Sequence, residues 1–187
     1  LPTVSSLLPS SVAAGGANVP VTVSGTRFVT GSIVHLNGQP RATAFVSATQ
    51  LTVTVLSTDL TTSGRFPITV VSPTPGGGTT APVNLTVLPQ VNTTSPTSVR
   101  AGSQGFSLAV NGAGFVVGTV VRFNGVSKST TFISSTQLSA SISSNDISTV
   151  GIFPITVLTP APDSLTSNAV NLNAIPSILN LTPLSAV

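Results

Sequence analysis

The stretch GRFPITVVSPTP, from Gly64 to Pro75, occurs again as GIFPITVLTPAP, from Gly151 to Pro162, 87 positions later. Further anchors share this offset without any insertion or deletion: Phe28 with Phe115, Asn37-Gly38 with Asn124-Gly125, Gln50-Leu51 with Gln137-Leu138, and Asp59 with Asp146. A fixed period in a sequence defines its structural unit. We therefore expect two successive domains, residues 1–87 and 88–174, and not one domain of 187 residues.

Within each repeat, apolar residues alternate with polar ones. The alternating sets of the first repeat are Val19, Val21 and Val23, then Leu51, Val53 and Val55, then Val83, Leu85 and Val87. Those of the second repeat are Phe106, Leu108 and Val110, and Leu138, Ala140 and Ile142. A period of two is typical of a strand that buries one face. The pattern predicts several short strands in each repeat.

The repeated FPITV is itself predicted to be a strand. Phe66, Ile68 and Val70 share one face, so we expect Phe66, and likewise Phe153, to enter the core. Pro67 has no N–H to donate to a sheet, which predicts a position at the start of a strand or at a sheet edge.

Turn signals separate the predicted strands. Asn37-Gly38 and Asn124-Gly125 suit tight hairpins, where both residues adopt positive φ. No window of 12 or more residues has a helical period. We expect only single helical turns near STDL (57–60) and SNDI (144–147), capped by Ser or Asp. Short strands at this spacing predict an all-β sandwich or barrel.

The second repeat resembles the IPT/TIG family of immunoglobulin-like domains. The motifs that carry the resemblance are Gly112, Gly114, Phe115 and Gly118, the Asn124-Gly125 hairpin, then Ser134, Thr136 and Leu138, and the closing Ser167-Asn168. In the first repeat Arg27 stands in place of Gly114, and Ala81-Pro82 aligns with Asn168-Ala169, so the closing Ser-Asn is missing. The resemblance implies two tandem immunoglobulin-like β-sandwiches stacked end to end. Members of the family occur in bacterial extracellular arrays, in receptors, beside carbohydrate-active enzymes and in DNA-binding regions of transcription factors.

The composition excludes several classes of protein. Hydrophobic residues make up 40% of the chain and the net charge is +3, which is unlike a disordered chain. Six Lys and Arg residues are scattered, whereas nucleic-acid binders gather them on one face, so we expect no nucleic-acid partner. No apolar run approaches 18 residues, so no membrane insertion is expected. Polarity that rests on Ser, Thr, Asn and Gly favours an extracellular or cell-surface location.

Residues that could perform chemistry are few, and we expect no catalytic, cofactor or metal site. His35, the one histidine, alternates with Val34 and Leu36 and is predicted to face solvent. Asp59 and Asp146 are predicted to bond backbone amides in turns. Three Asp residues over two domains are too few for a calcium site. Lys128 has no lysine counterpart in the first repeat, which argues against a repeated Lys–Asn crosslink.

The outward positions of the predicted strands carry hydroxyl groups and almost no charge: Thr52, Thr54, Thr69, Thr86, Ser139, Ser141 and Thr156. One explanation is that threonine is a good strand former. The other is a surface suited to lateral packing or to glycan contact, because few charges keep neighbours apart.

Residues 175–187, IPSILNLTPLSAV, repeat the beginning of a domain, with Pro176 and Pro183 at the positions of Pro2 and Pro9. They are predicted to be either the first strand of a further repeat or a strand that pairs with another subunit. The candidate residues are Ile175, Pro176, Ile178, Leu179, Leu181 and Pro183. The linker at Leu88-Pro89 is short, which predicts a stiff rod.

These observations favour a non-enzymatic structural repeat of an extracellular bacterial fibre, filament or surface protein, acting in extension and subunit association. Its expected partners are copies of itself or neighbouring repeats. The alternative is a carbohydrate-binding or adhesive module of a larger secreted protein. The chain has no Trp or Tyr, so only an exposed Phe could form the aromatic surface of a glycan site.

Overall fold

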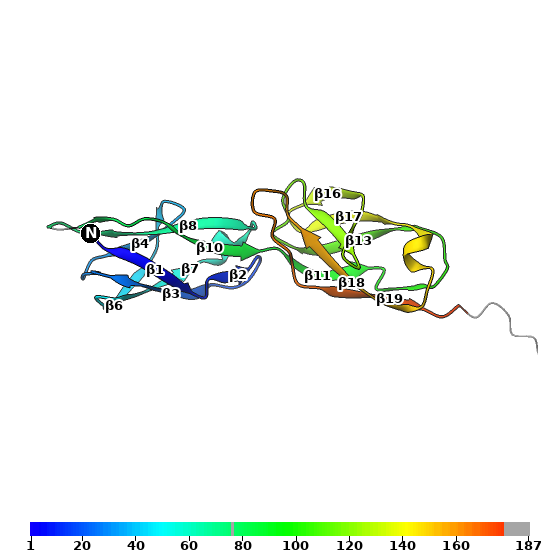
Figure 1. Ribbon diagram of the computed structural model, residues 1–187, viewed down its shortest axis with the longest axis horizontal. Helices are drawn as coiled ribbons and strands as arrows, with labels where there is room; N and C mark the ends of the chain where they lie inside the picture. The colour runs from blue at the N-terminus through cyan, green and yellow to red at the C-terminus, as the bar shows by residue number, and fades with distance from the viewer. Residues whose placement is uncertain (76, 178–187) are drawn as a thin grey trace, which may run out of the picture.

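The computed structural model describes residues 1–75 and 77–177, and its strands form two bodies that follow each other along the long axis (Figure 1). We call the body built from β1 to β10 the first module and that built from β11 to β19 the second module. The elements of the first module are β1 (Thr3–Leu8), β2 (Ser11–Ala13), β3 (Val19–Thr26), β4 (Ile33–Leu36), β5 (Gln39–Pro40), β6 (Thr43–Ser47), β7 (Gln50–Val55), the 3-10 helix η1 (Ser57–Leu60), β8 (Gly64–Ser72), β9 (Gly78–Thr79) and β10 (Val83–Leu88). Those of the second module are β11 (Gln90–Ser95), β12 (Ser98–Arg100), β13 (Phe106–Ala113), β14 (Val120–Phe123), β15 (Val126–Ser127), β16 (Thr130–Ser134), β17 (Gln137–Ile142), the 3-10 helix η2 (Ser144–Ile147), β18 (Gly151–Leu158) and β19 (Val170–Ile175).

Each module is a sandwich of two sheets. In the first module the strand orders are β1-β3-β7-β6 and β2-β10-β8-β4-β5, with β9 added beside β8. The second module repeats them as β11-β13-β17-β16 and β12-β19-β18-β14-β15. The pairings are antiparallel except β2 with β10 and β12 with β19. The prediction of an all-β chain with two immunoglobulin-like sandwiches is confirmed.

Each sandwich has its own apolar core, filled from the alternating strand positions. Val21, Val23, Leu51, Val53 and Val55 are buried in the first module, and their counterparts on β13 and β17 are buried in the second. The largest fully buried side chains are Phe28 and Phe115, which follow β3 and β13. The period-two pattern therefore located the inward faces of these strands correctly.

The prediction that Phe66 and Phe153 enter the core is wrong in degree, because both rings are only partly buried against it. Both lie near the beginning of their strands, two residues after Gly64 and Gly151. The Phe153 ring stacks on Phe123 with 5.0 Å between centroids. Phe28 and Phe115 fill the centre instead.

The position predicted for Pro67 is also wrong, because β8 is an interior strand with β10 on one side and β4 on the other. The Pro67 carbonyl oxygen accepts a hydrogen bond from the Asn37 N–H at 2.8 Å, just beyond the end of β4. An N–H at Pro67 would point to the same side of β8, but β4 ends at Leu36 and offers no strand partner there. Pro154 and Asn124 repeat this contact at 2.9 Å. Proline is tolerated because no neighbouring strand needs its N–H there.

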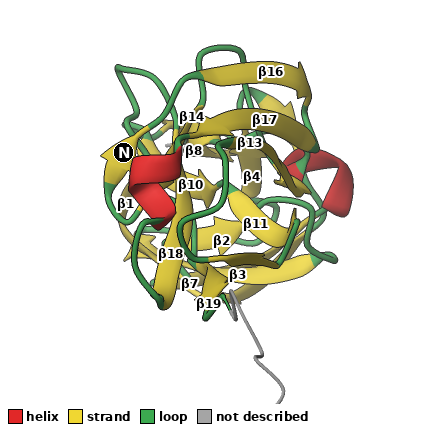
Figure 2. Cartoon of the chain, turned by 90° about the vertical axis from the view of Figure 1, so that its right-hand side faces the viewer, coloured by secondary structure: helices red, strands yellow, loops and turns green. Residues whose placement is uncertain are grey.

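The predicted local signals are present in both modules. Asn37 and Gly38 have φ values of 51° and 78°, and Asn124 and Gly125 have 48° and 81°, as a tight hairpin requires. The two predicted helical turns are η1 and η2, which lie at opposite sides of the view along the long axis (Figure 2).

The modules are rotated relative to one another about the long axis. In both views β3 and β7 lie on the lower side of the molecule, whereas their counterparts β13 and β17 lie on the upper side (Figures 1 and 2). Like sheets of the two modules therefore face different sides.

Of the candidate inter-subunit strand, Ile175 is the last residue of β19 in the second module, and its carbonyl oxygen accepts the Ala101 N–H at 2.8 Å. Pro176 follows it. Ile178, Leu179, Leu181 and Pro183 lie outside the described residues.

Candidate functional site

The residues considered for chemistry lie apart. Within residues 1–75 and 77–177, no three His or Asp side chains come together as a metal site would require, and no cavity is found. His35 points out of the sheet, with its Nδ1 3.2 Å from the carbonyl oxygen of Gly38. Among the described residues, no helix is long and apolar enough to cross a membrane.

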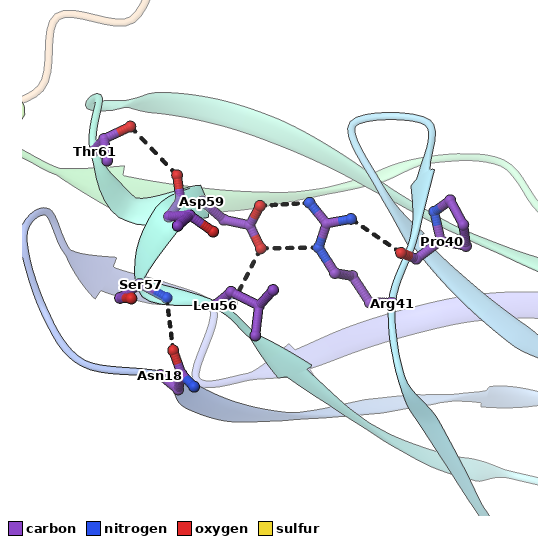
Figure 3. A network of polar contacts seen from close by, with 8 residues as sticks. Asn18, Pro40, Arg41, Leu56, Ser57, Asp59 and Thr61 are labelled. Atoms are coloured by element: carbon purple, nitrogen blue, oxygen red, sulfur yellow. Dashed lines mark hydrogen bonds and ion pairs between the residues drawn. The ribbon is translucent and has the colours of Figure 1, made fainter.

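Asp59 and Asp146 accept backbone amides in turns, as predicted: the N–H groups of Leu56 and Ser143 donate to them at 3.1 and 2.9 Å. The sequence interpretation missed their second partner. In the first module Arg41 holds Asp59 through two parallel hydrogen bonds, with Nε 2.9 Å from Oδ2 and with Nη2 on Oδ1 (Figure 3). This two-pronged geometry is the strong form of an Arg–carboxylate contact.

Lys128 and Asp146 form the corresponding ion pair in the second module. Arg41 occupies the position of Lys128 in the first repeat. The first repeat therefore has a cation there, although it has no lysine. Both pairs are largely covered, with side-chain exposures between 12% and 18%. Each pair ties a 3-10 helix to the segment before β6 or β16. Their role in this position is structural.

The ion pairs set the titration of both carboxyl groups. The hydrogen bond from Arg41, followed by that from the Leu56 N–H, lowers the pKa of Asp59 below its ordinary value against the opposing effect of burial. Burial acts to raise the pKa of Asp146, but hydrogen bonds from Lys128 and Ser143 together outweigh it and lower that pKa too.

Stability is therefore expected to fall in acid. A carboxyl group whose pKa is lower in the folded state stabilises the fold above its unfolded pKa of about 3.9, and this contribution disappears as the pH falls through the folded value. Below about pH 4 the unfolding free energy of the wild-type chain is expected to fall with pH more steeply than that of Asp59→Asn. The difference is expected to reach up to about 1.4 kcal/mol per pH unit. Urea unfolding between pH 2 and 6 measures the slope. Identical slopes for both proteins would contradict the assignment.

The contacts between the two modules form the candidate functional site, which we call the junction. Only Pro89 separates the end of β10 from the start of β11. Ser63, just before β8, donates to the Gly114 carbonyl oxygen through its Oγ at 2.6 Å and its N–H at 3.2 Å. Arg65 Nη1 lies 3.1 Å from Asp163 Oδ1. The modules are thus joined by side-chain contacts in addition to the covalent linker.

The junction also depends on close backbone approach. Gly114 is buried with φ at 75°, and a Cβ there would overlap the Cβ of Ala14. A Cβ on Gly15 would lie 2.6 Å from that of Ala113. Ala113, although part of the second module, packs against the core of the first. The second glycine of the Gly-x-Gly-Phe motif therefore serves module docking here.

The sequence interpretation missed the junction residues Ser63, Arg65 and Asp163. A signal was present, because the repeats diverge at these positions: Val150 and Ile152 replace Ser63 and Arg65. The Arg65–Asp163 pair is partly exposed, at 44% and 33%, so its own contribution is expected to be at most about 1 kcal/mol.

The closing Ser167-Asn168 motif has a clear structural task. Asn168 accepts the N–H of Val91 at its Oδ1 and donates from Nδ2 to the Val91 carbonyl oxygen, both at 2.8 Å. The register of β11 against β13 shifts between Val91 and Thr93, and Val91 is only 1% exposed. Asn168 therefore satisfies buried backbone groups beside the bulge.

The Asn168→Ala variant is expected to destabilise the second module by about 1–3 kcal/mol, because it leaves the buried N–H and carbonyl of Val91 unpaired. Urea unfolding measures this change. Asn171→Ala, on the exposed side of β19, is the control in the same module, expected to change stability by less than about 0.5 kcal/mol. Equal losses in both variants would refute the role of Asn168.

The predicted hydroxyl-bearing positions do lie on the outer faces. Thr52 and Thr54 alternate with buried residues of β7, and Ser139 and Ser141 do so on β17. Ser139 shares a hydrogen bond of 2.7 Å with Ser107 on the neighbouring strand. Among the described residues, Phe45 is the one phenylalanine in the set of exposed large apolar side chains, 41% exposed on the edge strand β6. It pairs with inward-facing Leu51, so it does not continue the outer hydroxyl face.

Comparison with known proteins gives one family match, over the first module. A model described as the IPT/TIG domain matches residues 2–87, the repeat that carries Arg27. No curated protein sequence matches the chain.

Three solved structures illustrate the similarities in structure. Plexin A4, as its full extracellular region, is 13% identical with a TM-score of 0.37, over 94% of this chain and 18% of that one. A protein crystallised with a xylogluco-oligosaccharide is 15% identical with a TM-score of 0.48, over 91% and 40%. The Yersinia pseudotuberculosis adhesin InvE is 15% identical with a TM-score of 0.36, over 93% and 58%. The chain thus spans less than two thirds of each of these proteins.

Proposed function

Since residues 2–87 match the IPT/TIG domain model, and the second module repeats their strand order, we propose that the chain is a non-enzymatic extension module of an extracellular fibre or surface protein. The junction is the observation that supports this most directly. A linker of one residue, the Ser63–Gly114 contacts and the Arg65–Asp163 pair hold the two sandwiches end to end. Two modules held in this way keep a fixed distance and direction between their far ends, which an extension module requires.

The surface fits the same role. Of the six cations, all within the described residues, Arg41, Arg65 and Lys128 are paired with the three aspartates. Among the described side chains, Arg27, Arg100 and Arg122 are the charged groups outside these ion pairs. With so few unpaired charges, repulsion between neighbouring copies is weak. Lateral association of such shafts is the second part of the proposal.

Small-angle X-ray scattering tests the extension role. The wild-type chain is expected to scatter as one elongated rod. In Gly114→Ala the added Cβ overlaps Ala14, so a broader distribution of dimensions is expected. Gly102→Ala is the matched control, because Gly102 has nearly the same φ of 73° and no atom within 4 Å of an added Cβ. A wild-type chain as flexible as Gly114→Ala would refute extension.

Negative-stain electron micrographs and sedimentation test association separately. Bundles of laterally packed rods that grow with protein concentration are expected. Dispersed monomers under all conditions of salt and concentration would refute association but leave extension standing.

Glycan binding is the second candidate, favoured by the exposure of Phe45 on the edge strand β6. A glycan array tests it, with Phe45→Ala as the variant. Binding that disappears in Phe45→Ala would favour the adhesive role, and an array without hits would exclude it for the glycans displayed.

A further inference from the structure

The end of the second module that points away from the junction repeats the surface by which the first module holds the second. We call it the distal face, made of Ala101, Gly102, Thr149, Val150, Ile152 and Ile175. The repeat offset relates these residues to Ala14, Gly15, Thr62, Ser63, Arg65 and Leu88 of the first module. The backbone is the same in both, since the φ values of Gly15 and Gly102 are 70° and 73°.

The two surfaces differ in what covers them. Ala14 is 3% exposed and Gly64 is buried at the junction, whereas their counterparts Ala101 and Gly151 are both more exposed. The neighbouring apolar side chains of the distal face are open to solvent: Val150 is 58% exposed, Ile152 67% and Ile175 46%. Three adjacent exposed aliphatic side chains at one end of a module are typical of an interaction site.

The chemistry of the distal face also differs from that of the junction. Val150 replaces Ser63, which donates its hydroxyl to Gly114, and Ile152 replaces Arg65, which pairs with Asp163. The side chains that make polar contacts at the junction are thus replaced by apolar side chains on the distal face. A partner that docks in the same way therefore needs an apolar or uncharged residue where the second module has Asp163.

The close contact at Gly114 selects the partner further. A Cβ at that position would overlap the Cβ of Ala14, and Ala101 supplies the same methyl group on the distal face. A partner must therefore present glycine there. The first module of a second copy presents Arg27, exposed and with φ at 59°, so it does not fit in this geometry.

We infer that the distal face docks a following immunoglobulin-like module that carries glycine at the position of Gly114, and that it rejects the first module of another copy. The sequence after Ile175 repeats the start of a module, with Pro176 and Pro183 at the positions of Pro89 and Pro96. The partner is thus a module attached in the same chain. This inference rests on the proposed extension role and specifies which module the second module would contact next.

A three-module chain tests the inference: residues 1–175 followed by an added copy of residues 89–175, in which Asp163→Ala removes the carboxylate that would face Ile152. Because the added copy contains the same peptide with its own free distal face, the hydrogen-exchange signal of residues 149–152 is expected to divide in two. The half from the middle module is expected to slow by at least about tenfold relative to the two-module chain, as local opening is suppressed, and the other half is expected to stay unchanged. The variant with Gly114→Arg in the added copy, made to imitate Arg27, is expected to lose this protection.

Equal exchange with and without the added copy would overturn the inference. The extension role would still stand if the two-module chain scatters as a rigid rod, so the two failures are distinguishable. Sedimentation of the 187-residue chain tests the rejected partner. The expected result is no head-to-tail association through this face. Oligomers that Ile152→Asp abolishes would show that a second copy occupies it instead.

Discussion

Phe115→Ala is expected to lower the unfolding free energy of the second module by about 3–5 kcal/mol, the usual loss for a buried aromatic side chain cut to alanine. Phe115 is 1% exposed and is among the largest fully buried side chains of the core. The total stability of a domain is about 5–15 kcal/mol. The second module of this variant is therefore expected to melt well before the first.

Calorimetry shows whether the two cores are independent. Phe115→Ala is expected to move one of two transitions, and Phe28→Ala the other, because the two core clusters share no buried residue. Phe153→Ala is the control, with a smaller loss expected since its ring is only partly buried. A single transition that moves equally in all three variants would refute separate cores.

Gly25→Ala is expected to be the next most damaging change, although it adds only one methyl group. The Cβ would overlap the Thr3 carbonyl oxygen on β1 and lie 2.5 Å from Cζ of Phe28. Neither the strand nor the buried ring has room to move. Overpacking of this kind costs about 1–3 kcal/mol and occasionally more.

Gly16→Ala is the matched control for Gly25→Ala in the same module. Its nearest neighbours are the Ala13 carbonyl oxygen at 3.3 Å and Leu60 Cδ1 at 3.8 Å. Chemical unfolding of both variants measures the difference. Gly112→Ala is expected to repeat the loss in the second module, where the Cβ would lie 2.7 Å from Cζ of Phe115. Losses for Gly25→Ala no larger than for Gly16→Ala would exclude this role for the first motif glycine.

Local patterns predicted the fold because each one determines a backbone state directly. The alternation at Leu51, Val53 and Val55 has a single explanation, a strand with one buried face, and Asn37-Gly38 suits only a few turn types. The position of Pro67 was predicted wrongly because the proline is tolerated where the neighbouring strand β4 ends. The sequence around Pro67 holds no information about that end. The depth of Phe66 likewise depends on how far the sandwich extends past the start of β8.

The candidate site was less predictable because its contacts join distant segments. Arg41 and Asp59 are 18 residues apart, and Ser63 and Gly114 are 51 apart, so no local period reveals them. The substitution of Arg41 by Lys128 also hid a repeated ion pair from a search for identical residues. Comparing the repeats for conserved charge would have found the pair, and the divergence at Ser63 and Arg65 was a signal of the junction.

The rotation between the modules determines what a binding partner meets along the shaft. A flat neighbour lying against one side contacts the β3–β7 sheet in one module and a different sheet in the next (Figures 1 and 2). An antibody or receptor specific for one kind of sheet therefore finds its epitopes on different sides of the rod. On a longer array, the number of modules that such a molecule can bind at once depends on the rotation from one module to the next as much as on the number of repeats.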